Sequence, residues 1–284
     1  MRTLPPLYPE IRDFSAVVGH TEARHGTMLY LKNDAFIGRG LELYGELSEG
    51  ETVLFKQIIH QNAVVIEAGA NIGLHTLPMA RAAGPCGRVI AFEPQRIIFQ
   101  ILCANLAMNG IANVIMRNEA VGYIQKPEDQ WINVPPIDYT SRNNFGGIEL
   151  GGDLGERVCV TPIDSLNLAR LDFLKADVEG MEMMCLKGAQ ETIRRCQPTL
   201  YVENNRTHLS PALNKFMIEL GYNLWWHIPP LYEAKNFKNN SHNIFPKMIS
   251  TNVLALPKSR GVRVQGNRFR SVENPEEDWR SRFV

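Results

Sequence analysis

The sequence predicts an α/β fold in which helices cover both faces of a mostly parallel sheet. Short apolar segments alternate with helical segments of roughly ten to fifteen residues, which is the pattern of consecutive βαβ units. A glycine-rich turn follows the first apolar segment, and acidic residues follow several of the others. Because βαβ crossovers are right-handed, a three-layer sandwich is the simplest architecture for this order of elements.

Short apolar runs mark the strands, since a parallel strand that is buried on both faces lacks the alternation of a surface strand. Glycine, proline and an Asn-Gly pair end the helices between them. Ser210 is expected to cap the last helix, with Pro211 in its first turn. The expected strands are residues 63–67, 88–92, 114–116, 172–178, 199–203, 222–227 and 250–256, and the expected helices are residues 74–83, 97–108, 182–195 and 211–220.

The segments outside this alternation have weaker patterns. The N-terminal segment is punctuated by glycines and is expected to be loosely ordered, ending in a helix near residues 51–60. Ser48 and Glu51 have the spacing of a capping box at the start of that helix. The predicted organisation is an N-terminal cap at 1–62, a main domain at 63–257 with a Gly- and Pro-rich insertion at about 123–157 and a second long loop at 228–247, and a surface tail at 258–284.

The composition argues against several classes of protein. Lys plus Arg and Asp plus Glu each number 30 among 284 residues, so the formal charge is zero and a phosphate-driven nucleic-acid binder is disfavoured. An apolar run of about 18 residues is lacking, so we expect no membrane span. The opening MRTLPPLYPE lacks the apolar core of a secretory signal. The cysteines are odd in number and lack CxxC spacing, so we expect reduced thiols and a cytoplasmic protein.

The turn after the first strand indicates a nucleoside ligand. Residues 67–73 read EAGANIG, and glycines there allow a tight turn and the close approach of a ligand to the backbone. Glu93 ends the next strand, 26 residues after Glu67, where an acidic side chain can accept both hydroxyls of a ribose. Ligands of open α/β sheets bind beyond the carboxyl ends of the strands, so these residues are expected to share one site.

The sequence of the same turn favours one of two candidate nucleoside cofactors over the other. The spacing Gly69-x-x-x-Gly73 is not a complete G-x-G-x-x-G, the motif that places a dinucleotide pyrophosphate on a helix N-terminus. Asn71 in the turn and the acidic strand ends suit the sulfonium and ammonium groups of S-adenosylmethionine better than a diphosphate. We therefore favour S-adenosylmethionine over NAD. An NAD-dependent oxidoreductase and a non-catalytic binding module remain the alternatives.

Three blocks resemble the FkbM family of S-adenosylmethionine-dependent methyltransferases. They are VVIEAGANIGLHTLPMA (64–80), GRVIAFEPQ (87–95) and FLKADVEGMEMMCLKGA (173–189), with weaker support from TPIDSL (161–166) and PTLYVENN (198–205). The K-x-D-V-E-G-x-E signature begins at Lys175 and is specific to that family when it follows a GAN-x-G turn. Glu67 departs from the family, which often has Asp there. The resemblance covers roughly residues 40–257.

The resemblance implies a fold and a reaction. The fold is the class I methyltransferase fold, a seven-stranded sheet whose last strand, here near 250–256, runs antiparallel. The reaction is O-methylation of a hydroxyl on a sugar, a glycan or a natural-product small molecule. A nucleic-acid acceptor is disfavoured by the zero net charge and by the lack of an N/D-P-P-Y/F motif.

The resemblance also implies cofactor contacts. The methionine part would lie on the glycine turn, the ribose on the second strand end and the adenine on the third, while Asp177 would approach the amino group or the reacting methyl. Glu179 either joins this site or organises the turn after the strand, and His75 lines or caps the cofactor pocket. The expected contacts are Glu67, Gly69, Asn71 and Gly73 (methionine), Glu93 (ribose), and Asn118, Glu119 and Ala120 (adenine).

Candidates for catalysis and acceptor binding follow from the remaining strand ends and loops. An alcohol needs a nearby base, for which Asp177 and His208 are the candidates. The alternatives are a helix-capping carboxylate and an exposed histidine. The candidate acceptor contacts are Arg142, Asn144, Glu203, Asn204 and Trp226. Each long loop is expected to be a substrate lid, a dimer contact or a disordered segment, so a homodimer is a candidate state. Asp177, Glu203 and a histidine offer ligands for Mg²⁺, but their spacing does not require one and we expect no metal.

Overall fold

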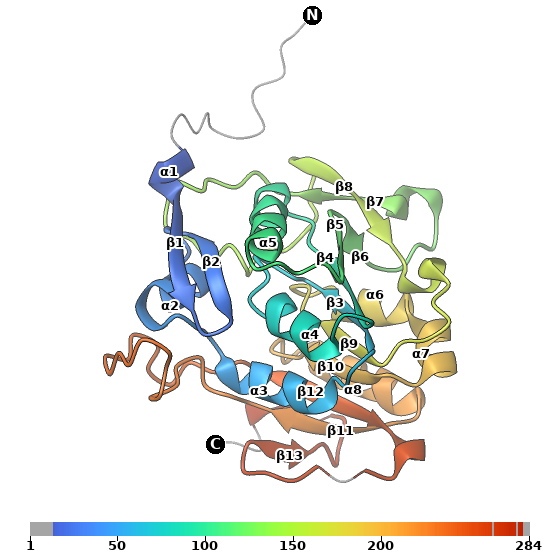
Figure 1. Cartoon of the computed structure of the whole chain (residues 1–284). Helices are drawn as coiled ribbons and strands as arrows, with labels where there is room; N and C mark the ends of the chain where they lie inside the picture. The colour runs from blue at the N-terminus through green and yellow to red at the C-terminus, as the bar shows by residue number, and fades with distance from the viewer. Residues whose placement is uncertain (1–13, 263, 277, 281–284) are drawn as a thin grey trace, which may run out of the picture.

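A computed structural model of the chain describes residues 14–262, 264–276 and 278–280 (Figure 1). Its centre is an eight-stranded sheet with the order β13-β11-β12-β10-β9-β3-β4-β5. The strands are β3 (Val64–Ala68), β4 (Arg88–Phe92), β5 (Val114–Arg117), β9 (Phe173–Ala176), β10 (Thr199–Glu203), β11 (Tyr222–His227), β12 (Asn252–Pro257) and β13 (Phe269–Ser271). The five strands β10, β9, β3, β4 and β5 run parallel, and β12 runs antiparallel to β10 and β11.

The predicted fold class is confirmed, with one additional strand. Seven strands occupy the expected segments, and the expected last strand is the antiparallel β12. The eighth, β13, comes from the segment expected to be a surface tail. It pairs antiparallel with the edge strand β11, and Phe269 stacks on His227 of that strand with ring centroids 4.6 Å apart. A sheet edge leaves backbone groups unpaired, and this addition satisfies them.

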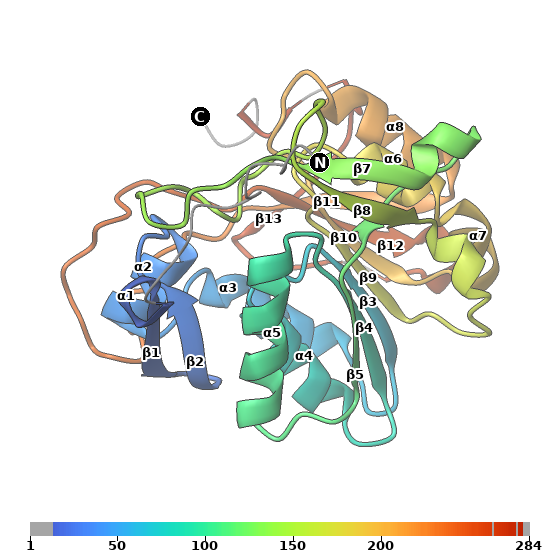
Figure 2. The same cartoon turned by 90° about the horizontal axis from the view of Figure 1, so that it is seen from above.

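Helices cover both faces of the sheet (Figure 2). One face carries α3, α4 and α5, and the other carries α6, α7 and α8. Apolar side chains of the buried parallel strands pack against both layers, for example Val65 on one side and Ile66 on the other. The helices are α3 (Glu49–Ile58), α4 (Thr76–Ala83), α5 (Arg96–Met108), α6 (Glu182–Lys187), α7 (Gln190–Cys196) and α8 (Ser210–Glu219).

Two helix predictions need correction. The helix expected over 182–195 is broken between α6 and α7, where Gly188 approaches the Gly122 carbonyl so closely that a Cβ would lie 1.9 Å from its oxygen. This contact comes from a distant segment, which explains why the local pattern did not predict it. Ser210 is the first residue of α8, rather than its cap, and no side-chain capping bond is made there.

The N-terminal segment is ordered from residue 14 onward, where we expected a loosely ordered cap. It forms α1 (Phe14–Val17), a hairpin of β1 (Val18–Ala23) and β2 (Gly26–Leu31), and α2 (Ile37–Tyr44) before the predicted helix α3. The hairpin packs beside α5, because Asn105 of that helix donates to the Leu29 carbonyl and accepts from the Leu29 N–H. Ser48 precedes α3 but bonds the Glu51 side chain rather than the backbone, so the predicted capping box does not form.

The insertion is partly regular. It adds a 3-10 turn η1 (Pro127–Gln130) and the strands β7 (Trp131–Val134) and β8 (Glu156–Thr161), which form a three-stranded sheet with β6 (Ala120–Val121) in the order β6-β8-β7. Two further 3-10 turns are η2 (Ile163–Leu166) and η3 (Lys258–Arg260).

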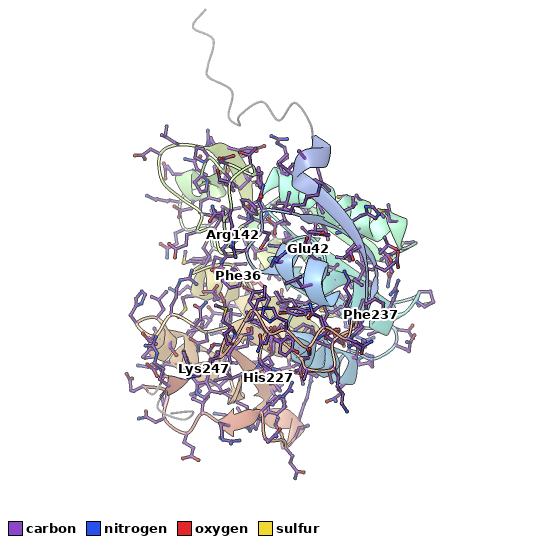
Figure 3. The ribbon with its side chains drawn as sticks, turned by 90° about the vertical axis from the view of Figure 1, so that its left-hand side faces the viewer. Phe36, Glu42, Arg142, His227, Phe237 and Lys247 are labelled. Atoms are coloured by element: carbon purple, nitrogen blue, oxygen red, sulfur yellow. The ribbon has the colours of Figure 1, made fainter. Side chains whose placement is uncertain are left out.

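Three segments outside the main sheet meet beyond its carboxyl end. They are the N-terminal segment, the middle of the insertion, and the connection between β11 and β12 (residues 228–251), which we call the late loop. The Ala35 N–H donates to the Asn143 carbonyl (2.8 Å), and the Ser48 N–H donates to the Leu231 carbonyl (2.9 Å). Figure 3 shows the face where the late loop, carrying Phe237 and Lys247, crosses the molecule near Phe36. These contacts close one side of a cavity.

Candidate active site

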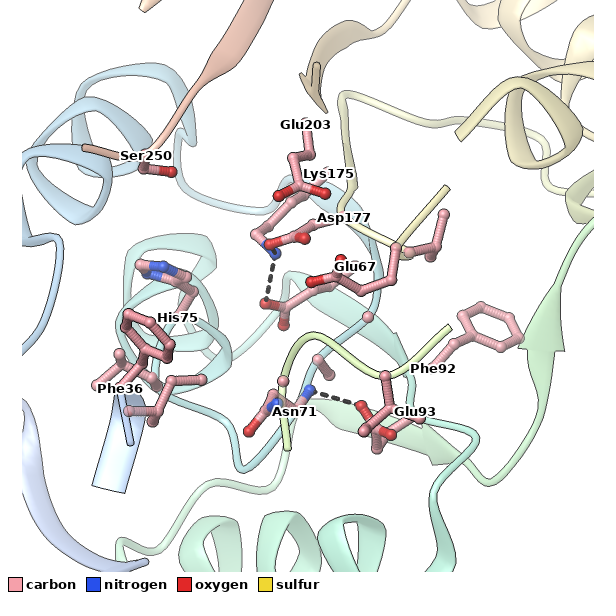
Figure 4. Close-up of a pocket in the computed structure, with 18 of the residues that line it drawn as sticks. Phe36, Glu67, Asn71, His75, Phe92, Glu93, Lys175, Asp177, Glu203 and Ser250 are labelled. Carbon is pink, nitrogen blue, oxygen red and sulfur yellow. Dashed lines mark hydrogen bonds and ion pairs between the residues drawn. The ribbon is translucent and has the colours of Figure 1, made fainter. Parts of the chain in front are cut away.

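A cavity of about 420 Å³ lies beyond the carboxyl ends of β3, β4, β9 and β10 (Figure 4). Its inner wall consists of the turns that follow these strands. Its outer wall consists of the three segments that meet beyond the sheet. The predicted site residues that line it are Glu67, Gly69, Asn71, His75, Glu93, Glu119, Ala120, Asn144, Asp177, Glu179 and Glu203.

The glycine turn is held against the end of β9. Gly69 has φ +82°, and a Cβ there would lie 1.8 Å from the Asp177 carbonyl oxygen. Glycine is therefore required by both the backbone conformation and the close approach. Asn71 also has a positive φ of 49°, which Asn tolerates, and its side-chain Oδ1 accepts from the Ile72 N–H (2.8 Å).

The backbone N–H groups of this turn already have acceptors. Those of Gly69 and Ala70 donate to the Phe92 carbonyl (3.0 and 2.9 Å), and that of Asn71 donates to the Glu93 carboxylate (2.9 Å). The Ile72 N–H is taken by the Asn71 side chain. A phosphate binds through free backbone N–H groups, so this turn is not built as a phosphate cradle.

Glu93 is buried behind the turn. One carboxylate oxygen accepts from the Asn71 N–H and the other from the Gln95 N–H, both at 2.9 Å. Burial raises the pKa of Glu93 to about 7, although these two hydrogen bonds act in the opposite direction. Each oxygen keeps a second lone pair, so a ribose hydroxyl can still donate to it. The ribose role remains a prediction.

Lys175 lies between two carboxylates beneath the cavity. Its Nζ is 3.0 Å from Asp177 Oδ2 and 4.0 Å from Glu67 Oε1 (Figure 4). Burial lowers the pKa of Lys175, but the two neighbouring carboxylates outweigh it and hold that pKa above the ordinary value. Glu67 also accepts from the Thr76 hydroxyl (2.6 Å), and burial raises its pKa to about 7. A charged lysine thus orients the two acidic groups that face the cavity.

We did not predict Lys175 as a site residue. In the sequence, Lys175 marks only the first residue of the K-x-D-V-E-G-x-E signature. The available signal was a lysine inside a strand whose other residues are apolar, a position where a charge persists only when it is paired.

Asp177 also belongs to a second cluster of carboxylates, together with Glu179 and Glu203. One ligand oxygen each from Asp177, Glu179 and Glu203 lie within 4.8 Å of one another. The Arg206 Nη2 lies 3.1 Å from Glu179 Oε2, and its Nη1 lies 3.7 Å from Glu203 Oε2. Burial, followed by the charges of Asp177 and Glu179, raises the pKa of Glu203. Carboxylates in this arrangement suit a hard cation, but here the Arg206 guanidinium already supplies positive charge.

His75 lies on the cavity wall near Phe36 (Figure 4). Its Nδ1 is 3.1 Å from the Thr52 hydroxyl, and the Phe55 ring packs edge-on against it at 5.3 Å between centroids. Burial, together with the nearby Lys175 charge, lowers the pKa of His75 to about 3, so the imidazole is neutral at physiological pH. Ser48 and Glu51 line the cavity beside it, with the hydroxyl 2.6 Å from Glu51 Oε1. Sequence reasoning missed both, because their spacing indicated only a helix cap.

The comparisons with known proteins agree with this geometry. A family model described as the methyltransferase FkbM domain matches residues 67–224, more than half of the chain.

The chain belongs to the FkbM methyltransferase family.

Similar proteins include methyltransferase sdnD of Sordaria araneosa, 26% identical over 196 residues that cover 57% of this chain and 74% of that protein. Methyltransferase 1 of Beauveria bassiana (strain ARSEF 2860) is 28% identical over 153 residues, covering 46% of this chain and 59% of that one. Among solved structures, the methyltransferase FkbM of Methylobacillus flagellatus KT has 20% identity and a TM-score of 0.44, covering 69% of this chain and 43% of that chain. M. jannaschii TYW2, solved in complex with AdoMet, has 14% identity and a TM-score of 0.44, covering 84% and 85%.

Four predicted residues of this FkbM-family methyltransferase lie away from the cavity. His208 is exposed on the turn before α8, and Arg142 is exposed on the insertion, on the face that Figure 3 shows. Trp226 is fully buried in the apolar core between the sheet and α8. Asn204 is buried and donates to the Asn214 side chain (2.9 Å), which ties β10 to α8. Since strand residues alternate between faces, the end of a strand does not by itself direct a side chain into the site.

Two further predicted contacts support the turns instead of lining the cavity. The Asn118 amide donates to the backbone carbonyls of Glu93 and Pro94, both at 2.9 Å. A Cβ on Gly73 would meet Leu102 of α5 at 2.8 Å, so this glycine serves helix packing. Within the described part of this FkbM-family methyltransferase, no helix combines the length and apolarity needed to cross a membrane.

Proposed function

We propose that this protein is an S-adenosylmethionine-dependent O-methyltransferase whose acceptor is a hydroxyl of a small molecule, either a sugar or glycan or a natural product. The observation that carries the proposal is the set of carboxylates that surround one cavity at the ends of the central strands, the buried Glu67 and Glu93 and the half-buried Asp177.

The residues present fit a cationic nucleoside cofactor. The inner wall offers several carboxylates, and its lysine, Lys175, is already paired with two of them. The turn N–H groups are all engaged, which disfavours the pyrophosphate of NAD. Glu67 would hold the methionine ammonium, Glu93 the ribose hydroxyls, and Glu119 with Ala120 the adenine edge.

The bound cofactor would supply an electrophilic methyl group on a sulfonium. The side chains would accept the proton of the acceptor hydroxyl and align that hydroxyl with the methyl group. Asp177 Oδ2 is held by Lys175, which leaves Oδ1 to accept the proton of the acceptor hydroxyl. The fixed orientation of Asp177 aligns the hydroxyl with the site, and alignment is the main requirement of an in-line transfer.

We also propose a small-molecule acceptor over nucleic acid, because the chain carries no net charge. The five cysteines are unpaired, and this supports the proposed cytoplasmic location.

Calorimetric titration tests the cofactor assignment. We expect S-adenosylhomocysteine to bind at one site per chain and NAD to give no heat of binding under the same conditions. Tritium transfer from methyl-labelled S-adenosylmethionine to hydroxyl acceptors then tests the reaction. Saturable binding of NAD without binding of S-adenosylhomocysteine would contradict the proposal.

A further inference from the structure

The outer wall of the cavity is rich in apolar side chains, and its polar members are Ser48, Glu51, Asn144, Ser250 and Thr251. The apolar side chains come from α2 and the residues around it, from the insertion and from the late loop, and we call these seven residues the acceptor vestibule. They are Phe36, Ile37, Leu47, Ile148, Leu150, Leu231 and Ile249. Figure 4 shows Phe36 beside His75, on the side of the cavity away from Glu93. Phe36 thus lies away from Glu93, while the insertion borders the carboxylates, since the Gln95 amide donates to the Phe145 carbonyl (2.8 Å).

Backbone hydrogen bonds fix the vestibule. Leu231 accepts from the Ser48 N–H (2.9 Å) and donates to the Met248 carbonyl (3.1 Å), so the late loop is tied to the start of α3 and to itself. The Phe36 ring stacks on Phe245 of the late loop, with centroids 5.9 Å apart. Five of the seven side chains are partly exposed, while they also pack against the apolar core. Partly exposed apolar groups that are held in place form a surface ready to contact a ligand.

The polar groups beside the vestibule are largely bonded to one another. Ser48 bonds Glu51, and the Asn205 amide bonds Glu203 (2.7 Å). His75 bonds Thr52 through Nδ1, and within the described residues no hydrogen bond reaches its Nε2. Glu203 Oε2 makes no hydrogen bond among the described residues, and the Ser250 hydroxyl accepts from the Asn252 amide (2.7 Å), while no acceptor in the described part of the chain takes its own proton. Hydroxyls on this side can therefore bond at single positions, which are His75 Nε2, Glu203 Oε2 and the Ser250 hydroxyl. A sugar that buries several hydroxyls against aliphatic side chains would lose hydrogen bonds to water without replacing them.

We propose that the acceptor is an uncharged molecule with an apolar ring or chain that fills the vestibule, and that its reacting hydroxyl lies between His75 Nε2 and Asp177. This deepens the proposed function and rests on it. A free sugar is disfavoured as acceptor. A small alcohol with an aromatic or alicyclic body matches both the apolar wall and the limited set of free polar atoms.

Binding, measured separately from turnover, tests the acceptor class. The probes are 1-naphthol, an uncharged fluorescent alcohol, and methyl β-D-glucopyranoside, a free sugar, each titrated into the protein with S-adenosylhomocysteine present. We expect 1-naphthol to bind at least about tenfold more tightly, since burial of an apolar ring in the vestibule is the main gain. Equal or tighter binding of the glucoside, or no detectable binding of 1-naphthol, overturns the proposal.

Two neighbouring side chains give a matched pair of variants. Ile249 lines the vestibule and is 36% exposed, whereas Met248 is 41% exposed and lies outside the cavity lining. We expect Ile249→Asn to weaken 1-naphthol binding by about fivefold, from lost apolar contact, and Met248→Asn to leave it unchanged. Equal effects of the two substitutions contradict the proposal.

Binding of S-adenosylhomocysteine is measured on the same variants. We expect it to stay unchanged, because neither side chain lies on the inner wall. This readout also separates the two proposals. Failure of S-adenosylhomocysteine to bind the unaltered protein would refute the cofactor assignment, whereas normal cofactor binding with no preference for 1-naphthol would refute the acceptor class alone.

Discussion

The two walls of the cavity are built in different ways. The inner wall comes from turns that directly follow the central strands, and its side chains are carboxylates held by backbone N–H groups, Thr76 and Lys175. The outer wall comes from three segments far apart in the chain, and it carries seven apolar side chains alongside a few polar ones such as Ser48 and Ser250. The difference suits the two walls to different ligands. In the function we propose, the inner wall would bind the cofactor and the outer wall would bind the acceptor.

The largest expected effect concerns the inner wall at Asp177. We expect Asp177→Asn to lower methyl transfer by about 10²–10⁴-fold, because the amide cannot take the hydroxyl proton. Initial rates at saturating S-adenosylmethionine measure the effect. Asp153→Asn, at an exposed carboxylate on the insertion, is the control and should keep full activity. Turnover of Asp177→Asn equal to that of the control would remove Asp177 from the site.

Substitution of Glu93 should weaken cofactor binding more than acceptor binding. We expect Glu93→Ala to weaken S-adenosylhomocysteine by about tenfold to a hundredfold, because it removes a charged acceptor and leaves the Asn71 and Gln95 N–H groups without a partner. Glu93→Gln keeps one acceptor oxygen, so it should lower the affinity for S-adenosylhomocysteine less than Glu93→Ala does. Calorimetry gives the dissociation constants, with Glu128→Ala at an exposed position as the control. An unaltered constant for Glu93→Ala would contradict the ribose assignment, and 1-naphthol binding should survive the change.

The smallest effect is expected from pH. Burial raises the pKa values of Glu67 and Glu93 to about 7, and a cation binds best when both are ionised. We therefore expect the affinity for S-adenosylmethionine to rise by about tenfold between pH 6 and 8. S-adenosylhomocysteine, which lacks the sulfonium charge, should show a weaker rise. A flat profile for S-adenosylmethionine would contradict the role of these carboxylates.

The affinity for S-adenosylmethionine should rise with pH, but the free energy of unfolding of the protein without cofactor should fall. Both carboxyls have folded pKa values near 7, above the ordinary value of 4.5, so the folded state binds more protons between these limits. The free energy of unfolding should fall as the pH rises from about 4.5 to 7. Thermal unfolding at about pH 5 and about pH 7, with and without S-adenosylmethionine, measures this difference, and Glu93→Gln should reduce it.

The sequence predicted local elements well where the signals were local. The bounds of β10 and β11 agree with the prediction, since Pro198 and Gly221 mark where these buried apolar runs begin. The break at Gly188 and the pairing of β13 were missed, because each depends on a partner that is distant in the chain.

The residues of the candidate site also fall into those with a local sequence signal, which were predicted, and those without one, which were missed. The turn at 67–73 and Glu93 are contiguous motifs and were found. None of the seven residues of the acceptor vestibule was predicted, because residues such as Phe36, Leu231 and Ile249 carry no pattern until the fold brings them together. On the outer wall, the sequence predicted only the neighbouring Asn144 as an acceptor contact. His208 and Trp226 were chosen from their position after or within a strand, and their orientation depends on packing against α8 and the core.

The fully bonded glycine turn has a consequence for selectivity in a mixture of metabolites. Many abundant molecules share the adenosine of the proposed cofactor but carry phosphates where it carries a sulfonium and an amino acid. The N–H groups of Gly69, Ala70, Asn71 and Ile72 have acceptors before any ligand arrives. A phosphate entering this turn would meet carboxylates and no free donor from these four residues, so competition by ATP or ADP should be weak.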